Sequence, residues 1–296
     1  MSFTAKFVLA LIGALLAAVI IAPIAAVVVA AMGFRFPFPR IFDRTVMVTL
    51  LIALIIFARQ SRFGPLIKRA FRNPRRNFPS AVRGLIVALF VMAILFTCAA
   101  LLGAHSGPSL YRRVGRIPGY VLSAIAVAII EEGFFRAFLL GGMTSDFGRG
   151  GALAVSSAIY SFAHLVHAPA HFYVRTFEPL VGLTDLSGSF SRLTHPASAV
   201  PALIGLFLLG LVLGEAFLLS GTVYFSMGLH AGFVLGAKTW PMMLTPGVPI
   251  PHWLAGYPHF PLISGVAAWI AAMILLALLP ALAGGRAWAF RNRSAS

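Results

Sequence analysis

Long stretches of this chain carry no charge at all, and they constrain its fold more than any other feature. Residues 7–33 contain 27 residues without Asp, Glu, Lys or Arg. Of the 296 residues, 60% are apolar and 10% are charged, whereas about a quarter of a soluble domain is charged. Too few polar side chains remain to cover a soluble globule. The sequence therefore predicts an integral membrane protein and excludes a soluble enzyme, a disordered chain and a disulfide-stapled secreted domain.

Eight apolar runs approach the roughly 20 residues that a membrane-spanning helix needs. They cover residues 7–33, 45–58, 84–103, 117–140, 150–167, 200–220, 222–237 and 262–283. The first run is longer than the apolar core of a secretory signal, which has about 7–15 residues, so we expect it to be retained as a helix. We predict an all-α, polytopic transmembrane helix bundle of about eight spans.

The basic residues indicate the topology. The net charge is +16, and its largest cluster lies in one loop, residues 59–83, at Arg59, Arg62, Lys68, Arg69, Arg72, Arg75, Arg76 and Arg83. The positive-inside rule places this loop in the cytoplasm, and alternation of the spans then places both termini there. The loop is expected to bind anionic lipids, and nucleic acid is not expected as a partner. The Ala- and Arg-rich composition favours a bacterial inner membrane.

One apolar run contains the motif EEGFFR at residues 131–136. Ionisable groups inside a bilayer are costly and therefore suggest function. On a helix, Glu132 and Arg136 lie four residues apart and can neutralise each other, whereas Glu131 points about 100° away. A desolvated carboxylate takes up a proton readily, which makes Glu131 a candidate general base. The alternative is an ion cluster that only fixes helix packing.

Two histidines lie in later apolar runs. His164 follows Tyr160 by four residues, and His230 lies in the run 222–237. Counted from the predicted cytoplasmic ends, Glu131, His164 and His230 lie at depths of roughly 15, 21 and 12 Å. These depths are compatible with one buried site, although either histidine alone could be a hydrogen-bonded packing residue.

In their order and spacing, these motifs resemble those of the CPBP family of intramembrane endopeptidases, which includes the type II CAAX prenyl proteases. The resemblance covers roughly residues 117–237. It implies a membrane-embedded, glutamate-dependent protease whose substrate is a membrane protein, a lipidated protein or a peptide.

The resemblance also implies a role for each motif residue. Glu131 would be the general base, and His164 would help to hold and deprotonate the water. Glu132 and Arg136 would form a supporting ion pair, and His230 would stabilise the oxyanion.

Two positions depart from the family pattern. Tyr160 stands where the family prefers phenylalanine, and Val234 stands where it has a polar residue that assists the second histidine. Loss of one oxyanion donor typically costs about 10²–10³ in rate. Either another group substitutes, such as Ser226, or the protein is slow or non-proteolytic.

A metal site is a further alternative. On a continuous helix His164, His167 and His171 would face one way and could bind zinc together with Glu131 or His230. Pro169 is expected to end the helix first. We therefore expect no cofactor, and a catalytic zinc ion is left open. Glu215, near the end of its run, is expected to be a helix-end carboxylate.

We divide the chain into an N-terminal three-helix membrane region at 1–116, a CPBP-like catalytic core at 117–238, and an outer loop, last helix and basic tail at 239–296. The main hypothesis is an intramembrane endopeptidase. The alternatives are a non-catalytic membrane scaffold or chaperone of the same fold, which Val234 favours, and a proton- or metal-coupled transporter. The sequence leaves the oligomeric state open.

Overall fold

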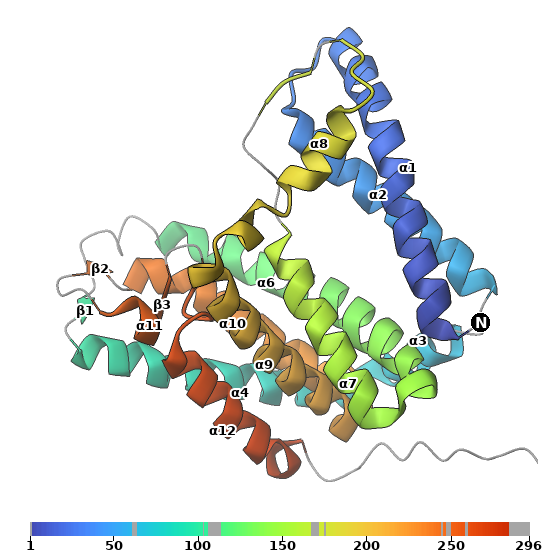
Figure 1. The fold of residues 1–296 in the computed structure, drawn as a ribbon. Helices are drawn as coiled ribbons and strands as arrows, with labels where there is room; N and C mark the ends of the chain where they lie inside the picture. The colour runs from blue at the N-terminus through green and yellow to red at the C-terminus, as the bar shows by residue number, and fades with distance from the viewer. Residues whose placement is uncertain are drawn as a thin grey trace, which may run out of the picture. The chain divides into compact units, whose positions relative to one another are not determined.

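A computed structural model describes residues 2–60, 64–102, 104–105, 114–166, 172–174, 176–243, 245–246, 250–257 and 260–283. These residues are almost entirely helical (Figure 1). Their strands are four two-residue segments, which form two antiparallel pairs: β1 (Ala104–His105) with β2 (Thr245–Pro246), and β3 (Gly256–Tyr257) with β4 (Phe260–Pro261). The all-α prediction is therefore confirmed for the part of the chain that the structure describes.

Each of the eight predicted apolar runs coincides with a helix. These helices are α1 (Phe3–Ala31), α2 (Phe38–Gln60), α4 (Pro74–Leu101), α6 (Ile117–Glu132) with its continuation η2 (Gly133–Leu140), α7 (Gly141–Leu165), α9 (Pro196–Ser220), α10 (Tyr224–Met243) and α12 (Val266–Leu282). The shorter helices are α3 (Gly64–Ala70), η1 (Val114–Arg116), α8 (Val181–Gly188), η3 (Ser191–Thr194) and α11 (His252–Ala255).

Three helices of the described chain, α1, α4 and α9, are long and apolar enough to cross a membrane, and α12 is apolar but shorter. Together with the composition, these helices identify an integral membrane protein. The number of eight spans and the cytoplasmic position of both termini stay predictions.

The chain forms two compact units. The first comprises residues 1–64 and 162–199 and contains α1, α2 and α8. Alanines recur every four residues along one face of α1, and small side chains let helices approach closely. The core of this unit joins that face to α2 and to the segment around α8, through Ala22, Ala26, Phe38, Phe42, Val174 and Val181.

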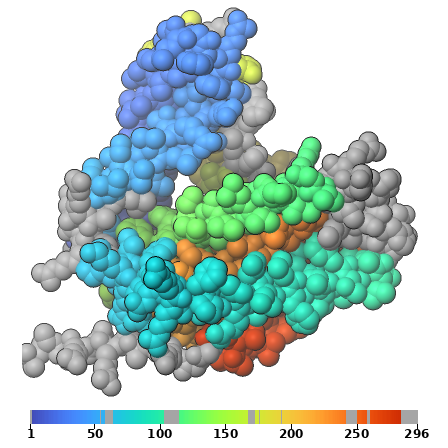
Figure 2. All heavy atoms as spheres, turned by 180° about the vertical axis from the view of Figure 1, so that it is seen from behind, coloured from blue at the N-terminus to red at the C-terminus, as the bar shows by residue number. Residues whose placement is uncertain are grey.

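The second unit comprises residues 65–161 and 200–296. Within it, α10 lies between α4 and α6 (Figure 2). Glycines allow the close crossing of α4 and α10: a Cβ atom on Gly84 would lie 2.3 Å from the Phe225 carbonyl oxygen, and one on Gly228 would lie 1.9 Å from that of Ala81. Thus α4, from the predicted region 1–116, packs in space on a helix of the predicted region 117–238.

A kink in α7 sets the direction of its second half. Gly148 has φ +67° and ψ −179°, which is not helical. This left-handed φ favours glycine, because a side chain would clash with the backbone there. The helix therefore restarts after Gly148 and carries Tyr160 and His164 near its end.

Candidate active site

The paired glutamates lie where the helix changes type. Glu131 and Glu132 end α6, and the next eight residues, η2, form a π-helix. Residues 117–140 form one apolar run in the sequence, and this pattern does not predict the change. A π-turn widens the helix by one residue per turn, and such turns are frequent at functional sites. Gly133 continues the helical backbone with φ −59° and ψ −44°.

Glu132 is fully buried and has two partners at one oxygen atom. Nη1 of Arg136 lies 3.4 Å from Oε1 of Glu132, so the ion pair that their spacing predicts forms in the structure. Nδ1 of His230, on α10, donates a hydrogen bond of 2.9 Å to the same oxygen. The contact between α6 and α10 thus adds a histidine to the predicted pair.

His230 contacts both glutamates. Its Nε2 atom lies 3.7 Å from Oε2 of Glu131, while its Nδ1 atom is engaged by Glu132. The His230 side chain is buried, and that of Glu131 keeps 26% of its surface exposed. Because Nδ1 donates to a carboxylate, the tautomer and the ring orientation of His230 are restricted, and Nε2 is turned toward Glu131.

Arg136 is a buried cation surrounded by aromatic rings. Its guanidinium carbon lies 4.7 Å from the centroid of the Tyr160 ring and 5.8 Å from that of Phe135. Its Nη2 atom donates to the Gly210 carbonyl at 3.5 Å. Ring faces attract cations, most strongly where water is excluded. These contacts join α7 and α9 to the site at η2.

Tyr160 has a structural position in the site. Its ring packs edge to face on Phe135 at 5.0 Å and on His230 at 6.3 Å, measured between ring centroids. The aromatic residue of the second motif therefore contacts residues of both other motifs. The spacing of four residues before His164 marks Tyr160 as a motif residue, but it does not predict these contacts.

His164 lies on α7, one helical turn after Tyr160, with a half-buried side chain. The chain passes from the second compact unit to the first after Ser161. The participation of His164 in one site with Glu131 therefore stays a prediction.

Ser226 and Val234 lie one turn before and one turn after His230 on α10. Ser226 is fully buried beside the Glu132 carboxylate, and its hydroxyl donates to the Val223 carbonyl at 3.0 Å. Val234 is half-buried, and its side chain supplies no hydrogen-bond donor. The hydroxyl that could replace the family's polar residue is thus already engaged in this arrangement.

Glu215 lies apart from this group. It forms an ion pair with Arg149 that joins α9 to α7, and both side chains are partly exposed. No group of three or more His, Cys, Asp or Glu side chains within the described ranges is arranged to hold a metal ion. His167 and His171, which the zinc alternative invokes, lie outside the described residues.

The region that contains these motifs matches a known family model. The family model of Rce1-like type II CAAX prenyl endopeptidases matches residues 113–236, a range that contains all three motifs. Searches of curated proteins and of solved structures give no match to this chain. The family match confirms the resemblance on which the motifs agree: residues 113–236 are similar to the Rce1-like type II CAAX prenyl endopeptidase family.

Proposed function

We propose that this chain is an intramembrane endopeptidase that hydrolyses peptide bonds of membrane-associated substrates with a water activated by Glu131. The support comes from one arrangement, in which His230 contacts Glu132 through Nδ1 and Glu131 through Nε2. Glu132 is fully buried, whereas the Glu131 side chain is 26% exposed. Of the two glutamates, Glu131 is therefore the one whose side chain has surface left for a water molecule or a substrate, whereas its Oε2 atom, which faces His230, is buried.

The proposed chemistry needs one proton to move twice. Glu131 takes a proton from the water, and the hydroxide oxygen bonds to the scissile carbonyl carbon. His230 stabilises the resulting oxyanion through Nε2–H. In this step the ring carries a hydrogen on both nitrogens, because its Nδ1–H is donated to Glu132. When the carbon–nitrogen bond breaks, Glu131 returns the proton to the leaving amine, so that the products are a carboxylic acid and an amine. His164 would help to hold the water, as the family resemblance implies.

Glu132 and Arg136 act in this proposal as positioning residues. Glu132 accepts the hydrogen bond from Nδ1 of His230 and so directs Nε2 toward the reacting atoms. Arg136 neutralises Glu132 at 3.4 Å. A buried carboxylate with a single neutral donor would instead draw a proton to itself.

A cleavage assay tests the role of Glu131. The purified chain is reconstituted in liposomes with a fluorogenic peptide that ends in a farnesylated CAAX sequence, or with the same peptide without the prenyl group. We expect Glu131→Gln to lower the rate by about 10²–10⁴, the usual contribution of a general base. The matched control is Glu215→Gln, an acid outside the site, which should cleave like the wild type. Equal rates for Glu131→Gln and the wild type would refute the proposal.

The two peptides also separate substrate classes. Cleavage of the farnesylated peptide alone would indicate that the prenyl group is recognised, as the name of the matching family suggests. Cleavage of both would indicate a protease for membrane-associated peptides in general. We propose that no metal is required, and loss of activity on treatment with a strong chelator, restored by zinc, would contradict this.

Val234 favours a second candidate function, a non-catalytic membrane scaffold or chaperone. This side chain cannot donate to an oxyanion, and the Ser226 hydroxyl is engaged by the Val223 carbonyl. Complementation separates the two functions. A scaffold requires that Glu131→Gln rescues a deletion phenotype as well as the wild type does, and a protease requires that it does not.

A further inference from the structure

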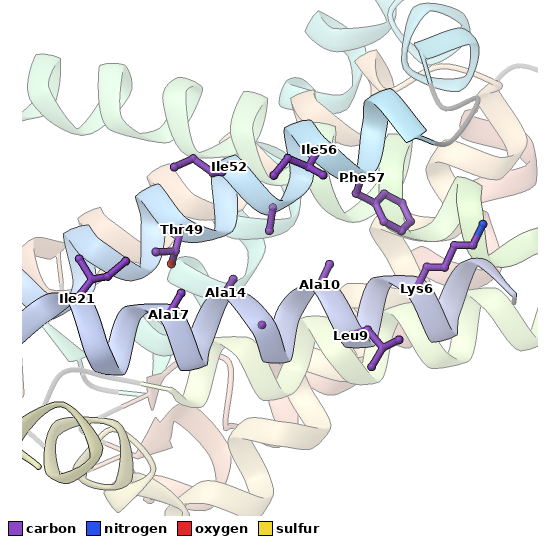
Figure 3. A pocket seen from close by; sticks show the side chains of 12 residues that line it. Lys6, Leu9, Ala10, Ala14, Ala17, Ile21, Thr49, Ile52, Ile56 and Phe57 are labelled. Atoms are coloured by element: carbon purple, nitrogen blue, oxygen red, sulfur yellow. The ribbon is translucent and has the colours of Figure 1, made fainter.

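An open groove of about 710 Å³ lies between α1 and α2 (Figure 3). The two helices contact each other at both ends of the groove. At one end Phe3 packs on Phe7 and Phe57, and at the other end Ala22 and Ala26 join the core around Phe38. Between these contacts the side chains of α1 are too small to fill the space.

The space beside Gly13 is empty. This residue lines the groove, and a Cβ atom added to it would meet no heavy atom within 4 Å. Ala10, Ala14 and Ala17 line the same side and face α2 (Figure 3). Pockets of about 300–1,000 Å³ are the size that takes up small ligands.

The chemistry of the lining defines what can occupy the groove. Its two polar residues are Lys6 and Thr49. The Thr49 hydroxyl is satisfied within its own helix, since it donates to the Thr45 carbonyl at 3.0 Å. Lys6 lies at the end near Phe57 (Figure 3). An apolar ligand with an anionic group at one end matches this pattern.

The length of the groove matches one leaflet of a bilayer. From Lys6 to Ile21 the helix rises about 22 Å at roughly 1.5 Å per residue. Half of a bilayer with its head groups measures about 20–22 Å. Because α1 is a candidate membrane span, a chain that enters at Lys6 would reach the bilayer centre near Ile21.

We propose that this groove binds one acyl chain of an anionic phospholipid, whose phosphate pairs with Lys6. The predicted topology places Lys6 on the cytoplasmic side, where the leaflet carries anionic lipids. This site lies within the first compact unit, and no described residue of the basic segment 59–83 lines it. It is independent of the proteolytic function.

Native mass spectrometry of the full chain in detergent micelles tests the proposal. The probes are phosphatidylglycerol and phosphatidylcholine with identical acyl chains. We expect one phosphatidylglycerol to be retained more tightly than phosphatidylcholine. Lys6→Gln should weaken phosphatidylglycerol about fivefold, the effect of one basic residue near a membrane surface, and leave phosphatidylcholine unchanged. Gly13→Leu should weaken both lipids at least about tenfold, because its side chain takes the space of the acyl chain.

Two control variants make the experiment specific. Gly119 lies on α6 and also has open space around an added Cβ atom, so Gly119→Leu should bind lipid like the wild type. Lys68→Gln removes a charge of the basic loop and should leave the tightly retained lipid in place. Equal retention by Gly13→Leu and the wild type would overturn the proposal. So would a stable dimer that Gly13→Leu dissociates, because a second copy would then be the occupant.

Discussion

Oε1 of Glu132 has two partners: it accepts a hydrogen bond from Nδ1 of His230 at 2.9 Å and forms an ion pair with Nη1 of Arg136 at 3.4 Å. All three side chains are almost completely buried. A buried charge is tolerated where it is paired, and removal of one partner leaves the other uncompensated. Single residues of this group should therefore affect stability as well as activity.

Arg136→Met should destabilise the protein strongly, because it leaves the Glu132 carboxylate buried without its counter-charge. We expect a loss of about 3–5 kcal/mol in the free energy of unfolding. Unfolding in micelles with a rising fraction of sodium dodecyl sulfate, followed by tryptophan fluorescence, measures this change.

The matched control for this prediction is Arg149→Met. Arg149 pairs with Glu215 at the surface, and such exposed pairs contribute about 1 kcal/mol or less. The double variant Glu132→Gln/Arg136→Met should lose less than the two single variants together, because no uncompensated charge remains. Equal losses for Arg136→Met and Arg149→Met would contradict the role of Arg136.

Asp185, on α8 in the loop between the fifth and sixth predicted spans, should make stability depend on pH. Its side chain is fully buried, and its two oxygens have no hydrogen-bond partner in the described part of the chain. Burial raises the pKa of the Asp185 carboxyl to about 6, and the nearby Asp43 contributes to the rise. The folded chain then binds a proton that the unfolded chain, with a pKa near 3.9, has lost.

Stability should therefore fall as the pH rises from about 4 to about 6, by roughly 3 kcal/mol at most. Asp185→Asn should remove this dependence and be the more stable form at pH 8. Melting temperatures of both proteins between pH 4 and pH 8 check this. Parallel curves for the two proteins would show that Asp185 does not titrate in this range.

Sequence spacing predicted part of the site at this scale. The pair of Glu132 and Arg136 follows from a separation of four residues on one helix. The bond from His230 to Glu132 joins positions 98 residues apart, and no local pattern encodes it. Gly210 contributes only a backbone carbonyl to Arg136, so its residue type carries no signal.

At the scale of elements, the position of His230 depends on how closely α10 crosses α4. Gly228 precedes His230 by two residues, and an added Cβ atom there would lie 1.9 Å from the Ala81 carbonyl oxygen. With a Cβ atom at position 228, the backbones of α4 and α10 could not stay this close. A change in the crossing would carry His230 away from the glutamates on α6.

Gly228→Ala should therefore lower both stability and cleavage, although it leaves every site residue in place. We expect a destabilisation of about 1–3 kcal/mol from overpacking and a fall in rate of about tenfold or more. The control is Gly119→Ala, which has open space. Circular dichroism melting and the liposome cleavage assay measure the two effects. Wild-type values for Gly228→Ala would show that the crossing can relax without moving His230.

The sequence predicts the helices but not the irregular points within them. Each apolar run marks a helix, because runs of this length and composition are typical of buried or membrane helices. The π-helix η2 was not predicted, since the run extends from α6 through Gly133–Leu140 and nothing in its pattern marks a change of helix type. The kink at Gly148 was also missed, because one glycine in a glycine-rich stretch does not identify the position with positive φ.

At the scale of the whole molecule, the motifs are distributed over two compact units. Glu131, Glu132, Arg136 and His230 belong to one unit, and His164 belongs to the other. Sequence order and predicted depth can suggest that these residues share a site. Order and depth do not show how close two spans lie in the plane of the membrane. The role of His164 in the site therefore stays a prediction.

The predicted topology can be tested with single cysteines. Cys98 is exposed on α4 and is first replaced by Cys98→Ser. Ser2→Cys and Ser191→Cys are then introduced one at a time. Five predicted spans separate positions 2 and 191, so an odd number of crossings places them on opposite sides of the membrane. In the predicted topology, the basic residues of 59–83 place Ser2 on the cytoplasmic side.

A membrane-impermeant maleimide added to intact spheroplasts should therefore label Ser191→Cys at once and Ser2→Cys only after lysis. The Cys98→Ser parent is the background control, and full labelling of Ser2→Cys after lysis shows that its thiol is reactive. Labelling of both positions in intact spheroplasts would mean an even number of crossings between them. In that case one helix before position 191 would not cross the membrane, and α2 would be the first to examine, because the apolar part of this helix is the shortest of the eight predicted runs.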